Sequence, residues 1–215
     1  MGVISSEKYT RTLKSLANRR VVAVFFLGFA SGLPLALAGG TLQAWMAVEG
    51  VDLKTIGFFS LVGLPYAFKF FWAPLLDRYA LPFLGRRRGW ILVTQLALMI
   101  LIVMLGFTSP KDTPWLVALF ALLLTFTSAS QDIVFDAYRT DVLREKERGL
   151  GAAVSVTGYR IAMLASGALA LILAGPLGWR LTYLLMAGLM LIGTMATIFG
   201  PEPEETVRPP QSLKE

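Results

Sequence analysis

Stretches of about 20 predominantly apolar residues recur along this chain, and each is long enough to cross a hydrocarbon core of about 30 Å as an α-helix. The chain is 55% hydrophobic and only 16% charged, and its mean hydropathy is +0.64. That balance is too apolar for a water-soluble domain of 215 residues. The sequence therefore predicts an all-α, polytopic membrane protein.

Hydropathy, together with glycine and proline breakers, divides the apolar part of the chain into six spans. They are expected at about 21–46, 55–76, 89–108, 114–138, 150–174 and 179–199. A basic amino-terminal segment, 1–20, precedes this bundle of 21–199. The Pro-rich and polar stretch 200–215 follows it and is expected to be a disordered tail.

Basic residues concentrate in the amino-terminal segment and in the second and fourth connections between spans. The odd-numbered connections carry little positive charge: Lys54, Lys111 and Arg180. By the positive-inside rule, both termini and the tail are expected in the cytoplasm. A cleaved signal peptide ending near Ala36-Leu37-Ala38 is the alternative, but the apolar stretch continues beyond this triplet.

The chain contains no cysteine and no histidine. Disulfides, thiol nucleophiles, histidine bases and the usual zinc sites are therefore excluded. No cofactor or metal is expected, and any proton handling falls to Asp or Glu. The formal charge of +6 is distributed in a way that fits membrane orientation better than nucleic-acid binding.

Small residues recur every four positions in the first and fifth spans, as at Gly28 and Gly32 and again at Gly158 and Ala162. Such stripes let two helix backbones approach closely, which is how membrane helices gain packing. Tight packing inside the bundle is the simpler interpretation, and a sliding face in a moving transporter is the alternative.

Two cations fall within the spans, Lys69 in the second and Arg160 in the fifth. Charges in hydrocarbon cost roughly 2.5–3.5 kcal/mol each on insertion scales, so they usually face a cavity or a partner. We expect both to contact an anionic solute, with snorkelling to the interface as the alternative for Lys69. Further polar groups suited to substrate contact are Gln43, Tyr66, Gln131 and Tyr159.

Asp132 and Asp136 lie four residues apart at the end of the fourth span, and therefore on one helix face, with Arg139 three residues further on. Asp132 lies just within the hydrocarbon by its expected depth, so it is the candidate proton acceptor. Asp136 is the candidate latch of a cytoplasmic gate together with Arg139. A solvated salt bridge at an exposed helix end is the simpler alternative.

The loop "APLLDRYALPFLGRRRGW" (73–90) resembles the signature between the second and third spans of the major facilitator superfamily, although its Asp-Arg and Gly-Arg-Arg elements stand further apart than usual. The resemblance implies gating roles for Asp77, Arg78 and Arg86–Arg88. The chain as a whole is similar to the AmpG family of muropeptide permeases. That likeness rests on "FASGLPLALAGGTLQAWM" (29–46), "IGFFSLVG" (56–63), "FLGRRRGW" (83–90), "SASQDIVFDAYRTDVL" (128–143) and "ERGLGAAVSVTGYRIAML" (147–164).

The resemblance implies proton-driven import of anhydro-muropeptides across the bacterial inner membrane for cell-wall recycling. Facilitators of this kind have about twelve spans in two halves, so six spans correspond to an amino-terminal half. We therefore expect partnership with a second six-helix half or a homodimer. A truncated, non-transporting fragment with an assembly or regulatory role is the alternative. A membrane enzyme is disfavoured, because no histidine base exists and the two aspartates share one helix.

Overall fold

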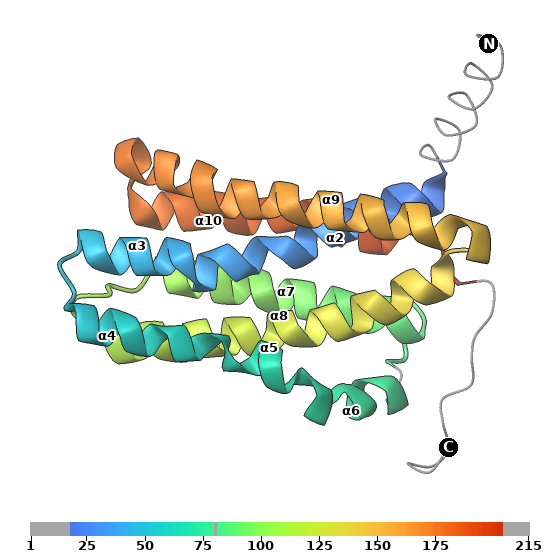
Figure 1. The fold of residues 1–215 in the computed structure, drawn as a ribbon, viewed down its shortest axis with the longest axis horizontal. Helices are drawn as coiled ribbons and strands as arrows, with labels where there is room; N and C mark the ends of the chain where they lie inside the picture. The colour runs from blue at the N-terminus through green and yellow to red at the C-terminus, as the bar shows by residue number, and fades with distance from the viewer. Residues whose placement is uncertain (1–17, 80, 204–215) are drawn as a thin grey trace, which may run out of the picture.

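The computed structural model describes residues 18–79 and 81–203. These residues form a bundle of helical columns that lie side by side along its length (Figure 1), with no β-strand among them. The described chain begins and ends at the same end of the bundle, where the Arg19 guanidinium donates to the Phe199 carbonyl at 2.7 Å. The expectation of an all-α membrane bundle is confirmed.

Among the described residues the columns and their connections contain thirteen helices and short helical turns. In chain order they are α2 (Arg19–Ala38), α3 (Gly40–Val48), α4 (Leu53–Phe58), η1 (Phe59–Gly63), α5 (Leu64–Phe68), η2 (Lys69–Phe71), α6 (Ala73–Arg78), α7 (Arg86–Gly106), α8 (Pro114–Val142), η3 (Glu145–Glu147), α9 (Arg148–Leu164), η4 (Ala165–Leu169) and α10 (Ala170–Phe199).

Four stretches have the length and hydropathy of membrane spans: Arg19–Val48, Arg86–Gly106, Pro114–Val142 and Glu145–Phe199. The last has 55 residues and reverses direction at Gly178, so it crosses twice. With the broken column of α4–α6, the bundle agrees with the expected six passes. The protein is therefore a multi-pass membrane protein.

The second column, expected as one helix at 55–76, is instead a series of short α-helical and 3₁₀ pieces from α4 to α6. Gly57 and Gly63 weaken the helix, while Pro65 and Pro74 begin the new pieces α5 and α6. Prolines fit the first turn of a helix because their missing N–H has no partner to lose there. This segment packs mainly against α8 and is more exposed than the other columns.

The fifth and sixth passes lie near their expected bounds of 150–174 and 179–199, but their connection is shorter than expected. α9 continues through the π-helical turn η4 into the start of α10, and the reversal follows Pro176 at Gly178. Gly178 has φ +76°, a left-handed conformation that glycine adopts without strain. The chain thus turns within a few residues of the predicted connection.

α2 and α9 pack backbone to backbone at their small residues. A Cβ added to Gly28 would lie 2.5 Å from the Ser155 carbonyl oxygen, and one added to Gly158 would lie 2.3 Å from that of Phe25. The close-packing interpretation of the small-residue stripes is therefore correct for this pair. The contact holds α9 firmly against α2, on the side where the polar residues of both helices meet.

The end of the bundle where α2 and α7 begin and α8 ends is called the charged end here. Pro201 and Glu202 attach to it: the Tyr138 hydroxyl donates to the Pro201 carbonyl, and Arg88 pairs with Glu202 at 2.8 Å. The first residues of the stretch expected to be disordered, 200–203, therefore contact the bundle. Most of the expected basic segment (1–17) and the rest of the tail (204–215) lie outside the described residues.

Candidate functional site

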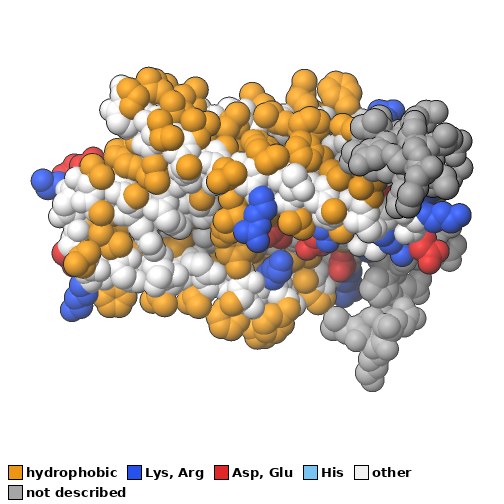
Figure 2. Space-filling view, turned by 45° about the horizontal axis from the view of Figure 1, so that its top comes forward, with side chains coloured by type: hydrophobic (Ala, Val, Ile, Leu, Met, Phe, Trp, Pro, Cys, Tyr) orange, Lys and Arg blue, Asp and Glu red, His pale blue; other side chains and the backbone are white. Residues whose placement is uncertain are grey.

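A cavity of about 420 Å³ lies between α2, α8 and α9. Its apolar walls carry a concentration of polar and charged groups: Ser31, Asp132, Asp136, Arg139, Ser155, Tyr159 and Arg160. The spacing of Asp132, Asp136 and Arg139 places them on one face of α8. Ser155 and Tyr159 share a face of α9, and Arg160 follows on the adjoining part of the cavity wall. Figure 2 shows acidic and basic side chains gathered midway along an otherwise largely apolar face.

Asp132 is the hub of this arrangement. The Ser31 hydroxyl donates a hydrogen bond to its carboxylate from α2. Lys69 and Tyr66, on the broken second column, lie within electrostatic range of Asp132, as does Tyr159 on α9. We call Ser31, Lys69, Asp132, Tyr159 and Arg160 the central cluster.

The cations of the central cluster remain accessible. Arg160 is exposed on the cavity wall and Lys69 is half-buried. Arg139 is held on the same wall by Asp136, at 3.0 Å, and by the Ser155 hydroxyl at 3.4 Å. A negatively charged solute entering the cavity would therefore meet Arg160 without displacing an ion pair described in this structure.

Several polar atoms beside the central cluster are buried without a hydrogen bond of ordinary geometry to any described residue. They are the hydroxyls of Tyr66 and Ser128, which face one another, and the side-chain carbonyl oxygen of Gln131. A buried polar group without a partner costs free energy that a water molecule or a bound solute can recover.

The other predicted substrate contacts are distributed differently. Gln131 is fully buried in α8 next to Asp132, and Gln43 lies half-buried in α3, outside the cavity. The structure thus brings together Asp132, Lys69, Tyr66, Tyr159 and Arg160 but does not add Gln43 to them. Among residues 18–79 and 81–203, no group of three or more Asp or Glu side chains is arranged to hold a metal ion.

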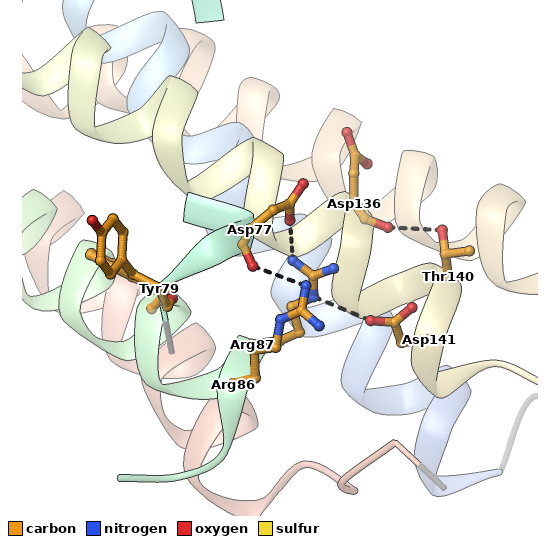
Figure 3. A network of polar contacts seen from close by, with 8 residues as sticks. Asp77, Tyr79, Arg86, Arg87, Asp136, Thr140 and Asp141 are labelled. Atoms are coloured by element: carbon orange, nitrogen blue, oxygen red, sulfur yellow. Dashed lines mark hydrogen bonds and ion pairs between the residues drawn. The ribbon is translucent and has the colours of Figure 1, made fainter. Parts of the chain in front are cut away.

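A second set of ionic contacts lies at the charged end (Figure 3). Arg87 binds the Asp77 carboxylate from α6 and, through Nε at 3.2 Å, Asp141 from α8. Arg86 donates to the Asp77 carbonyl at 3.0 Å. We call Asp77, Arg86, Arg87 and Asp141 the end cluster; it ties the start of α7 to the ends of α6 and α8.

Of the remaining predicted gate residues, Arg78 and Arg88 lie near the end cluster, whereas Asp136 and Arg139 line the central cavity. Arg88 donates to the carbonyls of Thr197 and Ile198 at the end of α10, which fastens α7 to α10. Arg78 is exposed at the end of α6. Asp136 pairs with Arg139 on its own helix, while its backbone carbonyl accepts from Thr140. The acidic partner that α8 gives to Arg87 is Asp141.

Sequence reasoning missed two important partners, Ser31 and Asp141. Ser31 directly precedes Gly32 in the small-residue stripe of the first span, and this polar position beside a close-packing glycine was the available signal. Asp141 follows Asp132 and Asp136 along the same helix, near the loop arginines in the expected topology. The sequence at neither position identifies the partner, because the rotation of each helix about its axis determines which side chains meet.

A bundle of antiparallel membrane helices around a charged, accessible cavity is the architecture of a transporter module. The Major Facilitator Superfamily model matches residues 24–215, and the chain belongs to this superfamily. It is 56% identical over 205 residues to the anhydromuropeptide permease of Escherichia coli strain K12, covering 94% of this chain and 42% of that protein. The resemblance to the AmpG family is confirmed.

More distant relatives are also matched over less than half of their own length. A putative transporter AmpG 1 of Rickettsia conorii is 35% identical over 86% of this chain and 45% of its own length. A putative transporter AmpG 4 of Rickettsia felis is 34% identical over 86% of this chain and 45% of its own length. The chain therefore spans less than half the length of the curated relatives it matches.

Proposed function

We propose that this chain supplies one six-helix half of a proton-coupled transporter that imports anhydro-muropeptides from the periplasm to the cytoplasm, and that it is not an enzyme. The observation that carries the proposal is the central cluster, in which an accessible Arg160 lines the same cavity as Asp132 and Lys69 lies near Asp132 inside a membrane bundle. The name of the Escherichia coli relative supports the substrate class.

Muropeptides carry carboxylates on their peptide and hydroxyl and amide groups on their sugars. Arg160 and Lys69 would attract the carboxylates, because the wall of the cavity is otherwise largely apolar and strengthens the attraction. Tyr66, Tyr159, Gln131 and, in another conformation, Gln43 would bind the polar sugar and peptide groups.

Asp132 is the proposed proton carrier. In its charged form it accepts from Ser31 and attracts Lys69, which holds α2, α8 and the second column together. Protonation would weaken both contacts, so the two charge states would favour different arrangements of these helices. A substrate that binds one arrangement better then couples its own movement to that of the proton.

The end cluster is the proposed cytoplasmic gate, with Arg78, Arg88, Asp136 and Arg139 around it. Its ion pairs join α6, α7 and α8 and would have to separate for these helices to move apart. The positive-inside rule then orients the charged end and both termini toward the cytoplasm of the bacterial inner membrane.

A complete cavity would require a second wall, since the cavity described here is open on one side. We propose that a second six-helix half or a second copy of the chain supplies it. The experiment is uptake of labelled anhydro-muropeptide by cells lacking their own permease. These cells would express this chain alone, the part of the Escherichia coli relative that this chain does not match, or both together.

Uptake by both parts together and not by either alone supports a half-transporter, and uptake by this chain alone supports a homodimer. If the chain reaches the membrane but no combination imports the labelled muropeptide, the transport proposal is wrong and a role in assembly or regulation replaces it. Recovery of chemically altered muropeptide from the purified protein would favour an enzyme instead.

A further inference from the structure

Asp132 lies between two different environments along α8. Toward the charged end, the cavity of about 420 Å³ reaches from Asp132 past Phe135 and Asp136 to Arg139. In the other direction, the next residue on the same face is Ser128, which is fully buried and does not line this cavity. Along α8, Asp132 is therefore open toward the charged end and is covered by buried groups toward the opposite end.

Ser128 lacks the hydrogen bond that buried hydroxyls on a helix often form. Such a hydroxyl can donate to the backbone carbonyl four residues earlier. Ser130 donates in this way to Phe126 at 2.8 Å, and Ser166 donates to Ala162 at 2.9 Å. The Ser128 hydroxyl has no such bond among the described residues and faces the Tyr66 hydroxyl. Its proton and its lone pairs therefore stay available to a neighbouring group.

The pair of Ser128 and Tyr66 lies directly beside Asp132. Ser128 and Asp132 are four residues apart on one face of α8, a spacing that brings their Cβ atoms to about 5–6 Å. The Tyr66 phenol lies within electrostatic range of the Asp132 carboxylate. A hydroxyl both donates and accepts, so this pair has the groups needed to pass a proton to the carboxylate. The other donor or titratable groups around Asp132 are Ser31, Lys69, Asp136 and Tyr159.

An apolar layer covers the side of the pair that faces away from the charged end. Leu124 lies four residues before Ser128, Val62 lies four residues before Tyr66, and both are buried in the apolar core. The Thr125 hydroxyl donates to the Val62 carbonyl at 2.7 Å, which holds the second column against α8 at this level. Water from the opposite end would reach the pair only after this layer separates.

We propose that Ser128 and Tyr66 form the route by which a proton reaches Asp132 from the end of the bundle opposite the charged end. This inference rests on the proposed function, in which Asp132 is the proton carrier, and it adds a donor path to that site. Two unpartnered buried hydroxyls, one turn from Asp132 and behind an apolar layer, are the observations that carry it. Because the charged end is assigned to the cytoplasm, the route would serve the periplasmic side.

The transfer leaves both hydroxyls as they began. The Ser128 O–H bond breaks as its proton passes to an Asp132 carboxylate oxygen, directly or through one water molecule, and the Ser128 oxygen takes the proton of Tyr66. Tyr66 regains a proton from a hydronium ion that enters when the apolar layer separates. The net change is one proton moved from hydronium to Asp132. Tyr66 keeps its proposed contact with the substrate, since its oxygen can accept from one group while it donates to another.

The test compares Ser128→Ala, Ser128→Thr and Ser130→Ala in vesicles that contain this chain together with the unmatched part of the Escherichia coli relative. Ser128→Thr keeps the hydroxyl. Ser130→Ala removes a hydroxyl from the same helix that already has partners, the Phe126 carbonyl and the Trp72 indole N–H. Two rates are measured: proton uptake on addition of anhydro-muropeptide, and exchange of labelled for unlabelled substrate. Melting temperatures show whether each variant is folded.

Ser128→Ala should slow muropeptide-driven proton uptake by about tenfold or more, because a positioned proton donor is lost. Exchange should continue, since it needs no net proton transfer to Asp132. Ser128→Thr and Ser130→Ala should keep both rates near those of the unaltered protein. Equal proton uptake by Ser128→Ala and Ser130→Ala overturns the relay. An equal loss of exchange and proton uptake in Ser128→Ala also overturns it, because that result indicates a structural role.

A second measurement needs no transport. The infrared C=O band of protonated Asp132, identified by its loss in Asp132→Asn, reports the hydrogen bonds at this carboxyl group in the purified chain at low pH. Ser128→Ala should shift this band, whereas Ser128→Thr and Ser130→Ala should leave it in place. An unshifted band in Ser128→Ala overturns the relay. If the unaltered chain imports nothing in any combination, the proposed function fails, and the relay fails with it as a route for import.

Discussion

The central cluster and the end cluster contain similar residues, but their charged side chains differ in how fully they are paired. In the end cluster, Arg87 is bound by two carboxylates from two other helices. In the central cluster, Arg160 stays accessible on a cavity wall. Among the described side chains, only that of Ser31 donates a hydrogen bond to Asp132. Saturated ion pairs fasten helices together, whereas accessible charges remain available to a solute and a proton. This difference is the one expected between a structural latch and the proposed transport site.

The largest effect on the central cluster is expected from disrupting the close contact between α2 and α9, the helices that carry Ser31 and Arg160. Gly158→Leu would push a side chain into the backbone of α2, where a Cβ already meets the Phe25 carbonyl oxygen at 2.3 Å. We expect the free energy of unfolding to fall by more than about 2 kcal/mol, with little folded protein in the membrane. Thermal unfolding in detergent measures this.

Gly188→Leu is the matched control, because a Cβ there meets nothing within 4 Å. It should fold and melt like the unaltered chain. Equal stability of the Gly158 and Gly188 variants would contradict the close α2–α9 contact.

The proposed two-part transporter consists of this chain expressed together with the unmatched part of the Escherichia coli relative. In it, Arg160→Gln should lower substrate affinity by about tenfold or more, because the substitution removes a charged partner for the substrate carboxylate. Its melting temperature should change little, since Arg160 is exposed and shares no ion pair described in this structure. The readouts are the concentration dependence of uptake and thermal unfolding. Unchanged uptake affinity would remove Arg160 from the proposed site.

Substitutions in the end cluster should instead lower the stability of the chain. Arg87→Gln and Asp141→Asn should each destabilise the chain, and the double variant should lose less than their sum by about 1 kcal/mol, because the two side chains share one contact. A double-mutant cycle of unfolding free energies measures this coupling. Strictly additive losses would mean that the ion pair contributes nothing to the joint between α7 and α8.

The smallest effect is expected at the opposite end of the bundle. Asp52 caps α4, and hydrogen bonds from the Thr55 hydroxyl and backbone N–H lower its pKa. A lowered pKa adds stability above the ordinary range of a carboxyl group, and this stability is lost as the pH falls through the folded-state pKa. Asp52→Asn should therefore melt slightly lower than the unaltered chain near pH 7, and the difference should shrink below about pH 4. A constant difference across this pH range would contradict the charged cap.

The sequence predicted the columns of the fold well because apolar length and basic connections are strong signals. It placed Asp132 and Arg160 in the membrane and put the close-packing glycines on the correct faces. It could not predict the broken second column, because Gly57, Gly63, Pro65 and Pro74 allow either bends or a full break. The tertiary contacts with α8 decide which occurs.

The site was harder to predict than the fold. Sequence reasoning assigned Asp132 and Arg160 separate roles without placing them together, although both line one cavity, because position along a helix says nothing of how two helices are rotated toward each other. The same limitation hid Ser31 as the partner of Asp132 and Asp141 as the partner of Arg87. Helix rotation depends on packing across the bundle, which a single sequence pattern does not contain.

The most direct test of the central claim is proton movement in vesicles that contain the two-part transporter with Asp132→Asn. The Asn side chain keeps the size of Asp but carries no charge to exchange. We predict that addition of anhydro-muropeptide no longer causes proton uptake and that accumulation against a gradient is abolished, while exchange of labelled for unlabelled substrate continues. Proton-coupled accumulation equal to that of the unaltered protein would contradict the role of Asp132.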